Sequence, residues 1–251
     1  MINICNIDMS EGNLSLQARL DEVWGGDYDA YHICNVPETD YVTTYENLAE
    51  HLGGIKTCHA ANDTTTKFSK SRDIRPDPNQ LHYFCSHKRQ PLHSDYAYYD
   101  AETSADWLML YCLKPSKFGG QTHLLTVKTL VEIMEEYEPE LLERIKTDIV
   151  WEYTGVDGDK IHTKPLFDGT NINWNYFQIK NWHNSREVCE VREDFYFFLE
   201  QTIVAGNMYD YSKKWKSGDC IIFNDHTNLH GRDAFLGDRW LKDHAIFDPN
   251  K

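Results

Sequence analysis

Apolar residues recur at helical spacing in four parts of the chain, at residues 14–24, 43–52, 128–146 and 192–209. Each stretch places its apolar side chains on one face, as an amphipathic helix packed on a core does. In the second stretch, Thr43 is followed three positions later by Glu46, a capping box that predicts a helix beginning there. The regular stripe at 128–146 predicts one continuous helix.

Short apolar or alternating runs predict strands at residues 31–36, 107–113, 122–127, 149–154, 172–177, 221–223 and 239–247. Gly, Pro and Asp turns separate many of these runs. Strands and helices do not alternate regularly, which disfavours a doubly wound α/β fold. The pattern therefore predicts a mainly β fold, an antiparallel double-sheet jelly roll (double-stranded β-helix) with helices packed outside.

A polar stretch at residues 60–80 separates the first elements from the strand-rich remainder. We predict a long loop there, and loops of this length are commonly mobile or functional. No complete core precedes it, so it is not expected to link two domains. We predict a single domain over residues 1–251, a length that one barrel or sandwich domain often has.

Composition narrows the classes of partner. The formal net charge of −15 at pH 7 argues against binding to nucleic acid or anionic membranes, which needs a basic face. The seven cysteines contain no Cys-x-x-Cys, so a zinc ribbon or redox pair is not expected. The N-terminus lacks a signal-peptide pattern, and no stretch reaches membrane-spanning length. These features predict a cytoplasmic protein with a small-molecule substrate, and they leave a homo-oligomer open.

Candidate chemistry begins at His93-Ser94-Asp95. Residues i and i+2 of a strand point to the same side, so this pair can present an imidazole and a carboxylate to one ion. His230, far downstream, can complete a 2-His-1-carboxylate facial triad, whose open positions suit a non-heme Fe(II) oxygenase. Each of these residues taken alone is more often an ordinary hydrogen-bonded side chain. Zinc could use the same ligands, but a structural zinc site normally has a fourth protein ligand.

The surroundings of the three residues sharpen this interpretation. Gly119-Gly120-Gln121-Thr122 follows an apolar run after the first pair, and the run from Gly218 to Asp225 precedes Leu229-His230-Gly231-Arg232. Arg239 comes nine positions after His230, and its planar guanidinium suits a bidentate grip on a cosubstrate carboxylate.

From about Pro91 onward, these motifs resemble, in order, those of the taurine dioxygenase and γ-butyrobetaine hydroxylase (TauD/TfdA-like) family. That family consists of Fe(II)/2-oxoglutarate-dependent dioxygenases with a clavaminate synthase-like, cupin-like jelly roll. The resemblance implies Fe(II) bound by His93, Asp95 and His230, with 2-oxoglutarate and O2 as cosubstrates. It also implies that Arg239 binds the distal carboxylate of 2-oxoglutarate, with a hydrogen bond from Thr122 and with Arg232 as the second candidate arginine.

The resemblance further implies hydroxylation of an unactivated C–H bond in a small polar metabolite such as an amino acid, betaine or related acid. Desaturation or ring closure follows if a second hydrogen is lost. Halogenating relatives have a small residue at the carboxylate position, so Asp95 favours hydroxylation over chlorination. Candidate substrate contacts are Arg89, Tyr96, Tyr98, Asn173, Trp174, His82 and His244.

Each of these residues also has a purely structural interpretation. Arg89 can be a solvated charge, the Tyr and Trp residues can pack in the core, and the histidines can simply be hydrogen-bonded. Two further function classes stay open. One is a jelly-roll metal-dependent hydrolase or isomerase that needs no oxygen. The other is a non-catalytic binding domain that keeps only the fold. A triad accompanied by a trailing arginine favours the oxygenase, because a binding module has no need of all four residues.

Overall fold

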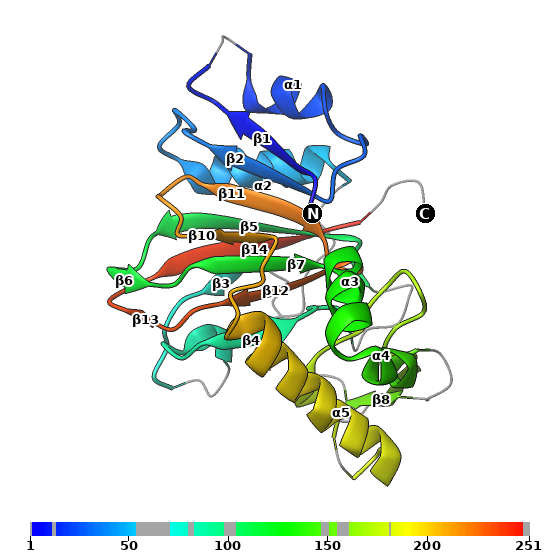
Figure 1. The fold of residues 1–251 in the computed structure, drawn as a ribbon. Helices are drawn as coiled ribbons and strands as arrows, with labels where there is room; N and C mark the ends of the chain where they lie inside the picture. Colours follow the sequence, from blue (N-terminus) through cyan, green and yellow to red (C-terminus); the bar gives the residue numbers. More distant parts are fainter. Residues whose placement is uncertain are drawn as a thin grey trace.

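Two β-sheets face each other, with helices packed on their outer sides (Figure 1). The computed structural model describes residues 2–11, 14–53, 71–79, 83–97, 104–146, 151–154, 161–180 and 182–247. This architecture is the jelly roll with flanking helices that the sequence predicts. Most of the predicted loop at 60–80 lies outside the described residues, although its last part contributes a strand, β3.

The larger sheet has six strands in the order β1-β2-β11-β5-β14-β3. Only β1 and β2 pair in parallel, and the other pairs are antiparallel. The strands are β1 (Ile4–Asp8), β2 (Ala30–Cys34), β11 (Cys220–Asn224), β5 (Trp107–Lys114), β14 (Trp240–Ile246) and β3 (Arg72–Ile74).

The smaller sheet has four antiparallel strands in the order β10-β7-β12-β4. They are β10 (Tyr211–Lys213), β7 (Thr122–Thr126), β12 (Asn228–Arg232) and β4 (Gln90–His93). Two further sheets have two strands each: β6 (Phe118–Gly119) with β13 (Phe235–Leu236), and β8 (Trp151–Thr154) with β9 (Ile161–Lys164).

The space between the two sheets is filled from alternate positions of the facing strands. Leu110 and Leu241 from the larger sheet meet Leu124 from the smaller one, with Ile221 and Phe223 beside them. The intervening residues of the larger sheet point the other way, so Met109 and Tyr111 pack on the outer side. Alternation therefore decides which strand residues can reach a site between the sheets.

The helices cover the two outer faces. Near β1 and β2 lie α1 (Leu16–Asp21) and α2 (Tyr41–His51), and on the other side of the molecule lie α3 (Val127–Tyr137), α4 (Pro139–Ile145) and α5 (Arg186–Phe198) (Figure 1). A π-helical turn at Leu199–Val204 continues α5, and short 3-10 turns lie at Tyr83–Cys85 and Tyr176–Gln178. None of the helices in the described ranges is long and apolar enough to cross a membrane.

Two helix predictions need correction. The predicted single helix at 128–146 is two helices, because Pro139 begins α4 and has no backbone N–H to continue α3. The helix predicted from Thr43 begins earlier, since the Asp40 side chain accepts the Thr43 backbone N–H and caps α2. The cap is therefore an aspartate three residues upstream of the predicted one.

The predicted strand at 172–177 is also wrong for most of its length. Ile172 forms an isolated bridge with Phe167, and the end of the run turns into the 3-10 helix at Tyr176–Gln178. Its backbone makes its hydrogen bonds elsewhere: the Asn173 N–H donates to the Leu166 carbonyl, and the Trp174 N–H donates to Ser94 Oγ.

The core under α5 offers a direct test of packing. Phe195 is fully buried and meets the Trp174 ring edge-on, with centroids 4.7 Å apart. We expect Phe195→Ala to lower the free energy of unfolding by about 3–5 kcal/mol. Phe197, on the same helix but 65% exposed, is the control, and its alanine variant should change stability by no more than about 0.5 kcal/mol. Urea denaturation measures both, and equal losses would contradict the packing described.

Candidate functional site

Two neighbouring strands of the smaller sheet bring His93 and His230 together. In the antiparallel pair of β4 and β12, His230 lies directly opposite His93, and paired residues project from the same face. The ring centroids are 4.1 Å apart, and both residues are buried. Residues far apart in the chain are thus neighbours through strand register alone.

Asp95 joins them just after the end of β4, at a position fixed through Ser94. The Ser94 backbone N–H donates to the Trp174 carbonyl (2.8 Å), and the Trp174 N–H donates to Ser94 Oγ (3.2 Å). Asp95 Oδ1 then lies 3.1 Å from His93 Nε2 and 3.8 Å from His230 Nε2. One donor atom from each of the three residues lies within 4.8 Å of the others, a spacing that can hold one metal ion.

The protonation states suit a metal. Burial and the neighbouring His93 lower the pKa of His230 to about 3, so this imidazole is neutral at neutral pH. Burial acts to raise the pKa of Asp95, but the Arg72 guanidinium and the two imidazoles hold that pKa well below its usual range. Metal ligands must be neutral imidazole and ionised carboxylate. Two imidazoles and one carboxylate are the donor set of a ferrous facial triad, so the residues fit Fe(II).

Asp225 lies behind this cluster and was not singled out from the sequence. Its carboxylate accepts the backbone N–H groups of Asp95 (3.1 Å) and Tyr96 (2.9 Å), and its Oδ1 lies 3.6 Å from His230 Nδ1. Burial and the charge of Asp95 raise the pKa of Asp225, whereas the two N–H donors oppose that rise. A carboxylate facing the distal nitrogen of a ligating histidine sets its tautomer and orientation.

We therefore expect Asp225→Asn to weaken divalent-metal binding about 10- to 100-fold, the range seen when such outer partners are removed. The amide oxygen replaces only one carboxylate oxygen, so the NH2 group faces either the Tyr96 N–H or the Asp95 N–H together with His230 Nδ1, and that side loses its acceptor. Isothermal titration of the apoprotein with Co(II) or Fe(II) measures the effect. Asp194, exposed and paired with Arg144 on the surface, provides the control variant Asp194→Asn, and equal affinities for both variants would contradict the role of Asp225.

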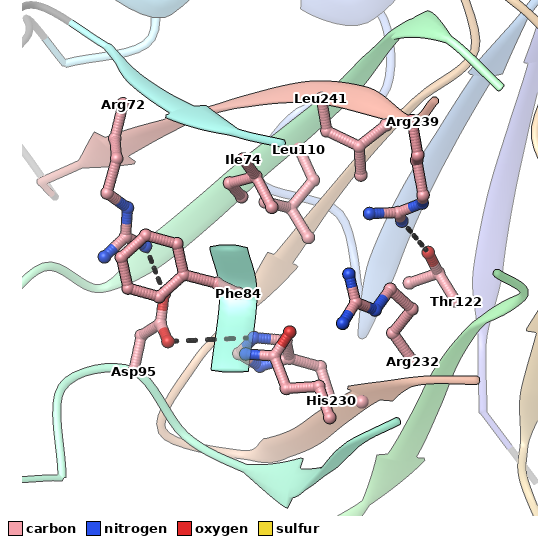
Figure 2. A pocket seen from close by; sticks show the side chains of 12 residues that line it. Arg72, Ile74, Phe84, Asp95, Leu110, Thr122, His230, Arg232, Arg239 and Leu241 are labelled. Carbon is pink, nitrogen blue, oxygen red and sulfur yellow. Dashed lines mark hydrogen bonds and ion pairs between the residues drawn. The ribbon is translucent and has the colours of Figure 1, made fainter. Parts of the chain in front are cut away.

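A pocket between the sheets joins the metal cluster to Arg239. Figure 2 shows Asp95 and Arg72 at one end, Arg239 and Thr122 at the other, and an apolar side between them. The pocket is lined by Arg72, Ile74, Phe84, Gln90, Asp95, Leu110, Thr122, His230, Gly231, Arg232, Arg239 and Leu241.

Arg239 is a buried cation with no acidic partner within ion-pair range in the described part of the chain. It donates to Thr122 Oγ1 at 3.4 Å, and burial together with the nearby Arg232 lowers its pKa to about 9. A buried charge without a counter-ion is costly. An anionic ligand in this pocket would remove that cost, so the residues also fit a carboxylate of 2-oxoglutarate.

Arg232 lines the same pocket but is already occupied. One of its terminal nitrogens contacts the backbone carbonyls of Tyr83 (3.3 Å), Ser86 (3.1 Å) and Lys88 (2.6 Å). Burial lowers the pKa of Arg232 to about 10. Arg232 therefore holds the segment before β4 in place, which leaves Arg239 as the better candidate for a ligand carboxylate.

The Gly-Gly pair before Thr122 has a steric reason. Gly119 and Gly120 have φ angles of +63° and +75°, a region that favours glycine. A Cβ at Gly119 would lie 2.2 Å from the Ala234 carbonyl oxygen. The close turn allows β7 to begin at Thr122, opposite Arg232 in β12.

The predicted substrate contacts fall in several places. Arg89 pairs with Glu200 on the π-helical turn and does not line the pocket. Trp174 packs its ring in the core under α5, and His244 stacks on Tyr111 on the outer side of the larger sheet. His82 and Tyr98 lie outside the described residues.

Asn173 and Tyr96 make contacts outside the pocket. The Asn173 side chain donates to the Pro165 carbonyl at 3.0 Å, and the Asn173 backbone carbonyl accepts from the Tyr153 hydroxyl. The Tyr96 ring packs with Ala105 and Ala245. Neither residue lines the pocket.

The pocket adds residues that the sequence did not single out. Phe84 and Gln90 line the metal end, and Arg72 hydrogen-bonds to Asp95. Phe84 and Gln90 come before the His93 motif, and Arg72 lies in the polar stretch at 60–80. A charged residue in such a stretch carries no sequence signal of its own, so Arg72 could be found only from the sheet pairing.

Comparison with known proteins adds independent findings. The family model described as "Taurine catabolism dioxygenase TauD, TfdA family" matches residues 34–243. That range contains every residue of the metal cluster and Arg239. The comparison with curated proteins found no match.

Several solved structures share the fold. An asparagine oxygenase aligns with a TM-score of 0.69 at 13% identity, covering 93% of this chain and 78% of its own. The PvcB protein from Pseudomonas aeruginosa gives 0.68 at 13% identity, covering 97% and 86%. The non-heme iron oxygenase OrfP, in complex with Fe and α-ketoglutaric acid, gives 0.60 at 15% identity, covering 93% and 79%.

Proposed function

Because the chain belongs to the TauD/TfdA family of Fe(II)- and 2-oxoglutarate-dependent oxygenases, we propose that it hydroxylates an unactivated C–H bond of a small polar metabolite. Among such metabolites we favour an amino acid or a closely related acid. His93, Asp95 and His230 would hold Fe(II), and Arg239 with Thr122 would hold the distal carboxylate of 2-oxoglutarate. The observation that carries the proposal is that one pocket is lined both by Asp95 and His230 of the triad and by a buried arginine without an acidic partner among the described residues.

The pocket residues divide the work of binding. Arg239 supplies a planar, charged donor for the distal carboxylate, and the Thr122 hydroxyl completes its hydrogen bonding. Ile74, Leu110 and Leu241 form an apolar wall beside it, which suits the methylene groups of a dicarboxylate and excludes water from them. Together these residues orient the cosubstrate with its keto-acid end toward the triad.

When bound, Fe(II) and 2-oxoglutarate supply oxidative decarboxylation that activates O2 for attack on a C–H bond. The chain's own part is to fix the ligands: Asp225 faces His230, the Pro91 carbonyl lies 2.9 Å from His93 Nδ1, and Ser94 fixes the backbone between His93 and Asp95. Asp95 contributes a carboxylate where halogenating relatives have a small residue. This residue supports hydroxylation, or desaturation or ring closure after loss of a second hydrogen.

The substrate class takes support from the structural neighbours. One is an asparagine oxygenase in complex with Fe(II), 3-hydroxyasparagine and succinate, and another is OrfP in complex with hydroxylated arginine. Both of those structures contain a hydroxylated amino acid. We extend this substrate class to the present chain as a proposal.

The test is a screen of free amino acids, betaines and related acids with Fe(II) and 2-oxoglutarate. We expect succinate to appear under air and not under nitrogen, with a product heavier by one oxygen for the true substrate. Mass spectrometry after reaction in ¹⁸O2 identifies that oxygen. Turnover of substrate without O2 would instead indicate a metal-dependent hydrolase or isomerase, and metal binding without 2-oxoglutarate binding would indicate a domain that keeps only the fold.

A further inference from the structure

We propose that Arg72, anchored by Asp243, is a positioning residue that keeps Asp95 bound to the metal through one oxygen only. This inference rests on the proposed metal site. It assigns a role to a residue of the polar stretch before β4, and it explains how the site keeps enough coordination positions open for both cosubstrates.

The anchor is a cross-strand pair. In the antiparallel pairing of β3 and β14, Arg72 lies directly opposite Asp243. The Arg72 backbone N–H donates to Asp243 Oδ1 (3.1 Å), its Nε donates to Asp243 Oδ2 (2.8 Å), and a terminal nitrogen also contacts Oδ2. The Asp243 side chain is 1% exposed. A fully buried carboxylate that binds two guanidinium nitrogens and the backbone N–H of the same residue fixes where that guanidinium reaches.

The guanidinium reaches the metal cluster. The same terminal nitrogen of Arg72 donates to Asp95 Oδ2 at 3.0 Å, whereas Asp95 Oδ1 lies toward His93 and His230. The Phe84 ring lies 5.0 Å from the guanidinium carbon and restricts it from another side. The two carboxylate oxygens of Asp95 therefore have different partners: Oδ2 accepts from the arginine, and Oδ1 faces the proposed metal position.

This division matters because a carboxylate can bind a metal through one oxygen or two. Two imidazoles and one carboxylate oxygen leave about three of six positions open on a ferrous ion. A keto acid that chelated the ion would take two of these, and oxygen would need the last. If Asp95 bound through both oxygens, that last position would be filled.

The link also joins the two sheets across the metal end of the pocket. Asp95 follows β4 of the smaller sheet, whereas Arg72 and Asp243 belong to the larger one. Figure 2 shows Arg72 descending from its strand toward Asp95, beside Phe84. The bridge thus depends on the jelly-roll packing and not on local sequence.

Water-proton relaxation of the Mn(II)-loaded protein tests this proposal by counting exchangeable waters on the ion. The unmodified protein should hold about three waters. The double variant Arg72→Met/Asp243→Asn removes both charges together, so neither is left buried alone, and should hold about two waters, with relaxivity lower by about one third. As a second variant, Arg72→Lys keeps the charge but lacks the Nε donor that helps hold the side chain on Asp243, and its count should also fall below that of the unmodified protein.

Arg192→Met is the matched control, because Arg192 is a buried arginine of α5 that bonds to the Ile179 carbonyl and Glu193, away from the pocket. Its water count should equal that of the unmodified protein. If the unmodified protein and the Arg72 variants all hold about three waters, this inference is overturned while the metal site stands. If the unmodified protein does not bind Mn(II) or Fe(II), the proposed function itself fails.

Discussion

Arg239→Met is expected to raise the concentration of 2-oxoglutarate needed for half-maximal turnover by about two orders of magnitude. Removing one partner of a buried, hydrogen-bonded charge pair costs about 2–5 kcal/mol, and each 1.4 kcal/mol is about tenfold in affinity. Arg239 has the required burial, and no acidic side chain in the described ranges lies within ion-pair distance of it. Anaerobic titration of the Fe(II) protein with 2-oxoglutarate, followed by its charge-transfer absorption, measures the affinity without turnover.

Two comparisons make this result specific. Arg239→Lys keeps a charge but loses the planar fork, so its affinity should fall between that of the unmodified protein and the methionine variant. Arg232→Met should mainly lower the midpoint of thermal unfolding, because Arg232 donates to the backbone carbonyls of residues 83, 86 and 88. A larger loss of 2-oxoglutarate affinity in Arg232→Met than in Arg239→Met would reverse the assignment of the two arginines.

The two arginines illustrate a general property of this pocket. Both guanidinium groups are buried, and the proximity of Arg232 is among the causes that lower the pKa of Arg239. Such a pair costs stability unless an anion binds. Binding of 2-oxoglutarate should therefore stabilise the fold by mass action. Two neighbouring buried guanidinium groups destabilise the free protein but suit a dicarboxylate ligand.

Sequence spacing was enough to bring the triad together. The register of β4 and β12 places His93 opposite His230, and Asp95 joins them because it follows His93 by two residues, just past the end of β4. The family resemblance gave Arg239 with Thr122, and Arg232 as the second arginine, as contacts of 2-oxoglutarate, and all three residues line the pocket. These residues lie in strands or next to them, where the place of a residue along the strand determines which way its side chain points.

The same alternation shows why other predictions did not meet the pocket. His244 and Asp243 are neighbours on β14, and only Asp243 faces inward, whereas His244 stacks on Tyr111 outside. Trp174 is on no described strand, so strand alternation does not predict the direction of its side chain. The structure buries that side chain against Phe195. An error of one residue in a strand, or an irregular backbone, is enough to turn a side chain away from a site.

Arg72 and Asp225 could not be identified from the sequence because their roles depend on long-range pairing. Arg72 reaches Asp95 only because β3 pairs with β14 at the edge of the larger sheet. Asp225 acts through the backbone N–H groups of Asp95 and Tyr96, which any residue types would supply. The local sequence pattern therefore predicts the residues that bind the metal or cosubstrate more readily than the residues that hold those side chains in place.

Asp95→Ala is expected to have the largest effect on this protein, with Fe(II) affinity at least about a hundredfold lower and turnover abolished. The change removes the only carboxylate of the three-residue metal cluster found among the described residues and leaves the Arg72 cation facing two imidazoles. The Arg72–Asp95 pair is part-buried and Arg72 keeps Asp243 as a partner, so the lost metal–oxygen bond is the main cost of the change. Titration with Fe(II) and then 2-oxoglutarate without oxygen should give no charge-transfer absorption, whereas Asp194→Ala on the surface should give the normal band. Normal metal binding and normal succinate formation by Asp95→Ala would show that the ligand set is wrong, because removal of a true ligand cannot leave the affinity for the ion unchanged.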